Sequence, residues 1–268
     1  MGTPESRVKL LESEVEVVKA YFSGLSDEEM QTPSACSDWD VADVVGHLAG
    51  QDHASRVRSG LLGDYSPPEG SPSVADHDED RFSKNIFDRA LATRERFGED
   101  LVTYFNQRVD ETVEVFKSVT PEDWDNLCYW PPGPEPVHAL LNQRIAELTM
   151  HTWDIRSVLE TNYHISDDSV RALTEGVDRA ARRAFRPDPS LTIPISHRFV
   201  IDRPFATRQD IIIGLDGAKV GPAGSEEPDV TFESDGETYV LIMFGRLQVM
   251  DARSEERRVG KECRSRWA

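Results

Sequence analysis

Hydrophobic residues in the first part of the chain recur at the spacing of one face of a helix. Over 4–22 they stand three or four positions apart, at Val8, Leu11, Val15, Val18 and Phe22. This period is typical of a helix that buries one apolar stripe. Gly24 stands where a glycine commonly ends a helix, so the pattern predicts a first helix from Pro4 to Phe22.

A second apolar stripe follows a polar segment that can cap a helix. Asp40 precedes the stripe formed by Val41, Val44, Val45 and Leu48, and an aspartate there accepts hydrogen bonds from first-turn amides. We predict a second helix from Asp40 to about Gly60, with His47 near its second turn. Residues 61–80 lack a period and are rich in Pro, Gly and Ser, which predicts a long surface loop.

Two more helices complete this part of the chain. No proline interrupts 81–118, and the apolar positions stay in register, so we predict a long third helix with a break near Gly98. Residues 131–134, Pro-Pro-Gly-Pro, exclude helix, and the period returns over 137–161 as a fourth helix. Four helices with two long connections predict a bundle over residues 1–162.

The pattern changes after Tyr163. Ser166 begins a capped helix that should run to about Phe185, before prolines at 187 and 189. Strand-like runs follow over 197–201, 210–215 and 229–233, with the turn pair Asp216-Gly217, and then a last helix over 238–246. We therefore predict a mainly helical protein with a small α+β second domain over 163–252, whose final element we expect to be missing.

The end of the chain differs sharply in composition. Residues 253–268 carry six Lys and Arg against three Glu and show no helical or strand period. A basic tail or a nucleic-acid arm would explain the charge, but the run Arg-Ser-Glu-Glu-Arg-Arg-Val-Gly resembles the conceptual translation of a short-read sequencing adapter. We interpret 253–268 as a non-native artefact and leave it out of the fold prediction. Deleting it should leave folding unchanged.

Composition and charge narrow the classes of function. A formal net charge of −19 repels a nucleic-acid backbone, and no apolar run reaches the 18 residues of a membrane span. The charged N-terminal residues argue against a signal peptide. Cys36, Cys128 and Cys263 are too few for a disulfide framework. We expect a soluble cytoplasmic protein with neither nucleic-acid nor membrane partners.

Candidate chemistry lies on the predicted fourth helix. Glu147 and His151 are four residues apart, so their side chains share a face and suit two ligands of one cation. Arg144 and Asp154 fall on the same face. Such a pair is also common on solvated helices, but the apolar neighbours Leu148 and Trp153 favour a site inside a bundle.

A third ligand could come from the second helix. His47 stands between Gly46 and Gly50, which allow close approach of another helix or of a ligand. His53 falls on another face of that predicted helix, so we interpret it as a surface imidazole. The remaining histidines lie in loops or at element ends and receive the same interpretation; they are His77, His138, His164 and His197.

Together these residues resemble a known family. Residues 36–50, Cys-Ser-Asp-Trp-Asp-Val-Ala-Asp-Val-Val-Gly-His-Leu-Ala-Gly, joined with Arg144-x-x-Glu147-x-x-x-His151-Thr-Trp-Asp154, resemble the metal-binding domain of mycothiol-dependent maleylpyruvate isomerase and its DinB-like four-helix relatives. Residues 228–247 resemble the family's sterol-carrier-like C-terminal domain. The resemblance implies a divalent metal, usually zinc, held by His47, Glu147 and His151, and mycothiol or another small thiol as cosubstrate.

This resemblance leads to a first functional hypothesis. Two imidazoles and one carboxylate leave an open coordination position, as in catalytic zinc sites. We expect a metal-dependent, thiol-using isomerase or S-transferase that acts on a small electrophile. Asp154 would orient an imidazole, and Arg144 would pair with Glu147 or with a substrate carboxylate.

Other interpretations stay open from the sequence. One is a non-catalytic module in which the metal braces the bundle and the second domain binds a small ligand. Another is hydrolysis by metal-bound water. We expect Cys36 and Cys128 to be packing residues, whereas substrate selectivity could be set by the acidic loop over 63–80 and the Pro-rich loop over 130–136.

Overall fold

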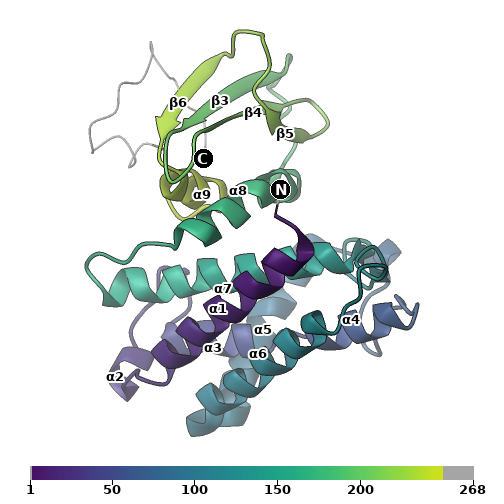
Figure 1. Ribbon diagram of the computed structural model, residues 1–268, viewed down its shortest axis with the longest axis vertical. Helices are drawn as coiled ribbons and strands as arrows, with labels where there is room; N and C mark the ends of the chain where they lie inside the picture. The colour runs from purple at the N-terminus through teal and green to yellow at the C-terminus, as the bar shows by residue number, and fades with distance from the viewer. Residues whose placement is uncertain (1, 250–268) are drawn as a thin grey trace. The chain divides into compact units, whose positions relative to one another are not determined.

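The computed structural model describes residues 2–249 of the chain (Figure 1). It divides into two compact units, one that ends at Tyr163 and one that begins at His164. The first is helical and the second combines two helices with a four-stranded sheet. The segment that we interpret as an artefact, with Cys263, lies outside the described residues.

Seven α-helices form most of the described part of the first unit. They are α1 (Pro4–Phe22), α2 (Asp27–Met30), α3 (Val41–Ala49), α4 (His53–Leu61), α5 (Glu79–Phe97), α6 (Leu101–Lys117) and α7 (Val137–Leu159). Two 3-10 helices, η1 (Val74–Asp76) and η2 (Gly98–Asp100), and a two-stranded sheet of β1 (Leu127–Cys128) and β2 (Glu135–Pro136) lie between them.

Four of these helices form the predicted bundle. α1 packs against α6 and α7, and α3 packs against the same two helices, so that the four close a ring (Figure 1). The apolar stripe of α1 is buried in this core, with Leu11, Val15, Val18 and Phe22 almost inaccessible to solvent. α5 packs on α3. The mainly helical fold class is confirmed.

The predicted second helix is wrong as one continuous element. α3 ends at Ala49, and α4 begins at His53 after a short connection. The direction of the His53 side chain therefore cannot be counted from His47 along one continuous helix. Only 4% of His53 is exposed. The interpretation of His53 as a surface imidazole is corrected for this reason.

The predicted break in the third helix is confirmed. α5 ends at Phe97, its C-cap Gly98 has φ of +47°, and η2 leads directly into α6. A positive φ is costly for residues with a Cβ, so glycine suits this reversal. The turn lets α6 join the bundle while α5 packs on α3.

The second unit consists of two helices and a mixed four-stranded sheet. Its elements are α8 (Asp167–Ala184), β3 (Ile195–Ile201), β4 (Thr207–Ile213), β5 (Ala218–Pro222), β6 (Val230–Ser234) and α9 (Gly236–Met243). The strand order is β5-β4-β3-β6, and β3 pairs antiparallel with β4 and parallel with β6. Phe199, Val177 and Tyr239 are buried in its core.

The sequence pattern did not predict β5. This strand contains a glycine and ends at Pro222, and both residues weaken a strand signal. β5 lies at the edge of the sheet and pairs only with β4 among the described strands. Proline is tolerated there because an edge strand needs hydrogen bonds on one side only.

Among the helices of residues 2–249, none has the length and apolarity to cross a membrane.

Candidate metal centre

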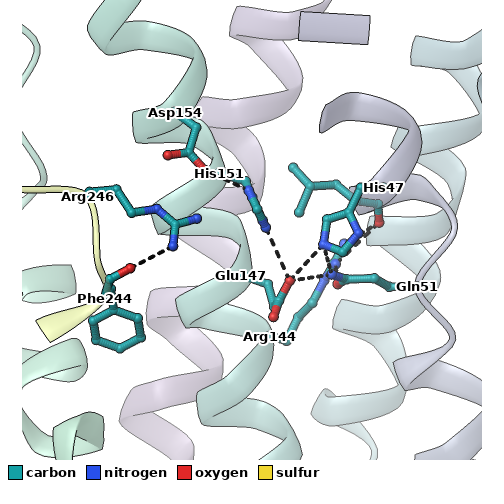
Figure 2. Close-up of polar contacts among 9 residues, drawn as sticks. His47, Gln51, Arg144, Glu147, His151, Asp154, Phe244 and Arg246 are labelled. Atoms are coloured by element: carbon teal, nitrogen blue, oxygen red, sulfur yellow. Dashed lines mark hydrogen bonds and ion pairs between the residues drawn. The ribbon is translucent and has the colours of Figure 1, made fainter. Parts of the chain in front are cut away.

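Three potential ligands from two helices converge inside the first unit. α3 starts with a reciprocal cap between Asp40 and Asp43 and carries His47 in its last turn. α7 carries Glu147 and His151 one turn apart. His47 Nε2 lies 2.9 Å from Glu147 Oε2, and His151 Nε2 lies 3.6 Å from the same oxygen (Figure 2).

This donor set fits a divalent metal. One ligand atom from each of His47, Glu147 and His151 lies within 4.8 Å of the others. Two imidazole nitrogens and one carboxylate oxygen are one of the common ligand sets of catalytic zinc, which keeps a further position for water or substrate. The structure thus brings together the three residues that the sequence singled out.

The electrostatics of the cluster favour an ionised carboxylate. Burial alone would raise the pKa of Glu147, but hydrogen bonds with His151 and His47 hold it well below its ordinary value. Burial lowers the pKa of His47, against the opposing effect of Glu147. A carboxylate beside a buried imidazole that favours its neutral form is ready to bind a cation, because metal ligands must be deprotonated.

Asp154 orients one of the imidazoles. Its Oδ2 lies 2.8 Å from His151 Nδ1, and the residue is fully buried. Burial opposes protonation, yet the hydrogen bonds with Asp154 and Glu147 raise the pKa of His151. Because Asp154 accepts the Nδ1 proton, loss of the second proton would leave the lone pair on Nε2, the nitrogen that faces Glu147, as in many carboxylate–histidine–metal arrangements.

Arg144 is linked to the cluster by Gln51, a residue that the sequence analysis missed. Its buried guanidinium donates to Gln51 Oε1 and to the Leu48 carbonyl oxygen (Figure 2). A guanidinium has only donors, so the Gln51 amide must present its oxygen to Arg144 and its nitrogen to the other side. There Gln51 Nε2 donates to Glu147 Oε2 over 2.7 Å and lies 3.0 Å from His47 Nε2.

The position of Gln51 in the sequence was a weak signal. It stands four residues after His47, a spacing that places two side chains on one helical face. The helix ends before Gln51, at Ala49. Only the fold shows that this side chain still reaches the ligand pair.

The segment before α3 closes another side of the cluster. The Trp39 ring centre lies 5.1 Å from that of His47 and 6.2 Å from that of His151. Cys36 Sγ falls within 4.8 Å of ligand atoms of His151 and Asp154. Ala35 N donates to the Asp154 carbonyl oxygen over 2.8 Å, which ties this segment to α7.

The other residues considered from sequence lie elsewhere. Cys128 is fully buried, and burial raises the pKa of its thiol to about 11, which disfavours the reactive thiolate. His77 lies 3.1 Å from Glu79, His138 stands in the first turn of α7, and His164 pairs with Glu237. His197 lies within β3.

Fold and cluster together define a class of protein. It is a chain of two compact units, in which a four-helix bundle with two histidines and a glutamate facing one another precedes a small α+β unit. The sequence profile of the mycothiol maleylpyruvate isomerase N-terminal domain matches residues 11–156, more than half of the chain. The protein belongs to this family.

Solved structures show the same fold. The crystal structure of a mycothiol-dependent maleylpyruvate isomerase matches with a TM-score of 0.65 and 14% sequence identity, over 91% of this chain and 90% of that chain. A histidine-to-alanine mutant of a mycothiol-dependent maleylpyruvate isomerase matches with a TM-score of 0.64 and 13% identity over the same shares. No curated protein sequence matches the chain.

Proposed function

We propose that this protein is a metal-dependent enzyme that uses a small thiol, such as mycothiol, to isomerise or modify a small electrophile in the cytoplasm. The observation that carries the proposal is the convergence of His47, Glu147 and His151 within 4.8 Å. Family membership supports the choice of thiol chemistry over other reactions of such a site. The three side chains would hold one divalent ion, with zinc favoured by the imidazole-rich donor set.

The surrounding residues hold the ligands in place. Asp154 keeps the proton of His151 on Nδ1, and Gln51 steadies the Glu147 carboxylate. The Trp39 ring beside both histidines limits access of water from its side. Glu147 keeps a side-chain exposure of 25%, so the cluster is not sealed from small molecules.

A small thiol supplies the nucleophile in this proposal. When bound, a divalent metal lowers the pKa of a coordinated thiol, so that the thiolate forms near neutral pH. The thiolate sulfur forms a bond to one alkene carbon of a substrate conjugated to a carbonyl group, and the alkene electron pair moves towards the carbonyl oxygen. Rotation about the new single bond and cleavage of the C–S bond return the trans alkene and the thiolate.

Turnover assays with and without thiol test this proposal. With zinc-loaded protein and a cis-unsaturated diacid such as maleylpyruvate, we expect turnover only with added thiol. Its rate should rise with pH as the thiol ionises and level off near neutrality. Equal turnover without thiol would overturn the proposal in favour of hydrolysis. If no combination from a panel of thiols and electrophiles gave metal-dependent turnover, the proposal would be overturned in favour of a non-catalytic binding module.

A further inference from the structure

Buried nitrogen atoms without protein partners gather at the start of α4. Neither ring nitrogen of His53 has a hydrogen-bond partner within the part of the chain that the structure describes, although the residue is 4% exposed. One turn later, Nη1 of Arg56 is also buried without a hydrogen-bond partner, and Arg56 is 7% exposed. Buried donors of this kind are costly unless a ligand or water accepts from them.

Arg56 is held rigidly from three sides. Its Nε lies 2.8 Å from Asp52 Oδ1, and its guanidinium carbon lies 4.8 Å from the Trp130 ring centre and 5.3 Å from that of Tyr129. The Tyr129 hydroxyl donates to the Pro72 carbonyl oxygen over 2.7 Å. Of the two loops that the sequence analysis linked to selectivity, the one over 130–136 contacts this arginine through Trp130, and the one over 63–80 reaches it only through the contact of Pro72 with Tyr129. The pair with Asp52 and the two rings orient the guanidinium for a planar acceptor.

A second arginine reaches the same region from α5. The stem of Arg89 lies over Gly50, where an added Cβ would come within 3.6 Å of Arg89 Cγ. Gly50 directly precedes Gln51, which contacts the ligand pair. Arg89 is half-buried and, among residues 2–249, no carboxylate forms an ion pair with it.

The described side chains that act on these donors include more positive than negative charges. Asp52 and Glu147 are the carboxylates that act on both His53 and Arg89. Against them stand Arg56, Arg89 and Arg144, so cations outnumber anions before any metal binds. In addition, the N-cap residue of α4, Asp52, makes no side-chain hydrogen bond to the first amides of this helix, so these amides add partial positive charge.

We propose that Arg56, Arg89, His53 and the first amides of α4 form a subsite for a carboxylate group, next to the candidate metal centre. The ligand class is a small organic acid whose other end reaches the metal. The contact between the other end of the ligand and the metal rests on the proposed function. Binding of a carboxylate at the subsite does not require catalytic activity. Burial, followed by the charges of Arg144 and Arg56, lowers the pKa of His53 to about 3. His53 would thus serve as a neutral N–H donor.

Binding of maleate by zinc-loaded, full-length protein tests the subsite. Isothermal titration calorimetry should show maleate affinity at least about ten-fold weaker in Arg56→Gln and in Arg89→Gln than in the unchanged protein, because each loses a charge-assisted hydrogen bond. Arg58→Gln is the matched control. Arg58 stands on the same helix but is half exposed and pairs with Glu111, so this variant should keep its maleate affinity within about two-fold.

Zinc content and melting temperature, measured on each variant, separate a loss of binding from a loss of folding. If Arg56→Gln is unstable, the half-buried Arg89 decides the question through Arg89→Gln. Maleate affinity that is equal in both variants and in the unchanged protein would overturn the subsite, since the metal alone would then hold the carboxylate. Absence of maleate binding to the unchanged protein would also overturn it. Arginine-dependent binding without thiol-dependent turnover would leave the subsite standing and overturn the proposed function.

Discussion

His47 and His53 are both buried histidines, six residues apart, yet their surroundings are opposite. His47 Nε2 contacts Glu147 Oε2 at 2.9 Å and Gln51 Nε2 at 3.0 Å. His53 has no hydrogen-bond partner on either nitrogen among the described residues, and the charges of Arg144, Arg56, Asp52 and Glu147 act on its pKa. One imidazole contacts a carboxylate, whereas the other has no hydrogen-bond partner among the described residues and lies under the influence of two guanidinium groups and two carboxylates.

This difference shows how two neighbouring regions of one bundle can suit opposite charges. Around His47 the ionised Glu147 and the lone pairs of two imidazoles favour a cation. Around His53 the arginines and the uncapped start of α4 favour an anion. A ligand with a metal-binding end and a carboxylate would satisfy both regions at once.

The largest expected effect is loss of the metal. His151→Ala removes one of the three proposed protein ligands, so we expect zinc content to fall from about one ion per chain to near zero. His47→Ala and Glu147→Ala should do the same. Elemental analysis of the purified variants measures this directly.

His53→Ala is the matched histidine control for metal content. Because His53 lies outside the ligand set, this variant should keep its zinc. Stoichiometric zinc in all three ligand variants would place the metal elsewhere in the chain.

A smaller effect should follow from the Gln51 amide. Gln51→Leu removes both the donor to Glu147 and the acceptor for Arg144, and we expect zinc affinity to fall by about 10- to 100-fold. Gln51→Glu keeps an acceptor for Arg144 but loses the donor, so it should also bind zinc more weakly. Competition with a chromogenic chelator measures the affinity.

The control for this pair is Gln107→Leu, at an exposed position of α6. Its zinc affinity should match that of the unchanged protein. Unaltered affinity in Gln51→Leu would show that the amide does not position the carboxylate.

The burial of His53 in its neutral form predicts that the stability of the fold depends on pH. The pKa of His53 is about 3 in the folded chain, whereas an unfolded histidine titrates near 6.5. Below pH 6.5 the unfolded state therefore binds the extra proton, and the free energy of unfolding falls as the pH drops towards 3. His53→Leu should reduce this slope by up to about 1.4 kcal/mol per pH unit.

Urea unfolding at pH 6 and at pH 4.5 measures the slope. His164→Leu is the control, since 76% of the His164 side chain is exposed. An equal change of slope in both variants would contradict a buried neutral state of His53.

The smallest effect is expected at the cysteines. In the proposed mechanism the nucleophilic sulfur belongs to the small thiol, so Cys36→Ser and Cys128→Ser should keep thiol-dependent turnover within about two-fold. Cys128→Ser places a hydroxyl at a fully buried position and should lower stability by roughly 1–3 kcal/mol. Loss of turnover in Cys36→Ser at unchanged zinc content would give that thiol a chemical role.

Elements with local signals could be predicted from the amino-acid sequence alone. The stripe over 4–22 and the break at Gly98 appear in the structure where the pattern placed them. Glu147, His151 and Asp154 lie along one side of α7 because helical spacing alone fixes their directions. The motifs in 36–50 and 144–154 also sufficed to indicate the family.

Features that depend on contacts between distant segments of the chain are visible only in the folded protein. The break between α3 and α4 changes the direction of every later side chain, so the burial of His53 and Arg56 was not visible in one continuous period. The Gln51 amide gains its orientation only from Arg144, 93 residues away. Local spacing fixes directions along one helix, whereas the environment of a buried polar atom is set by the helices and loops that pack around it.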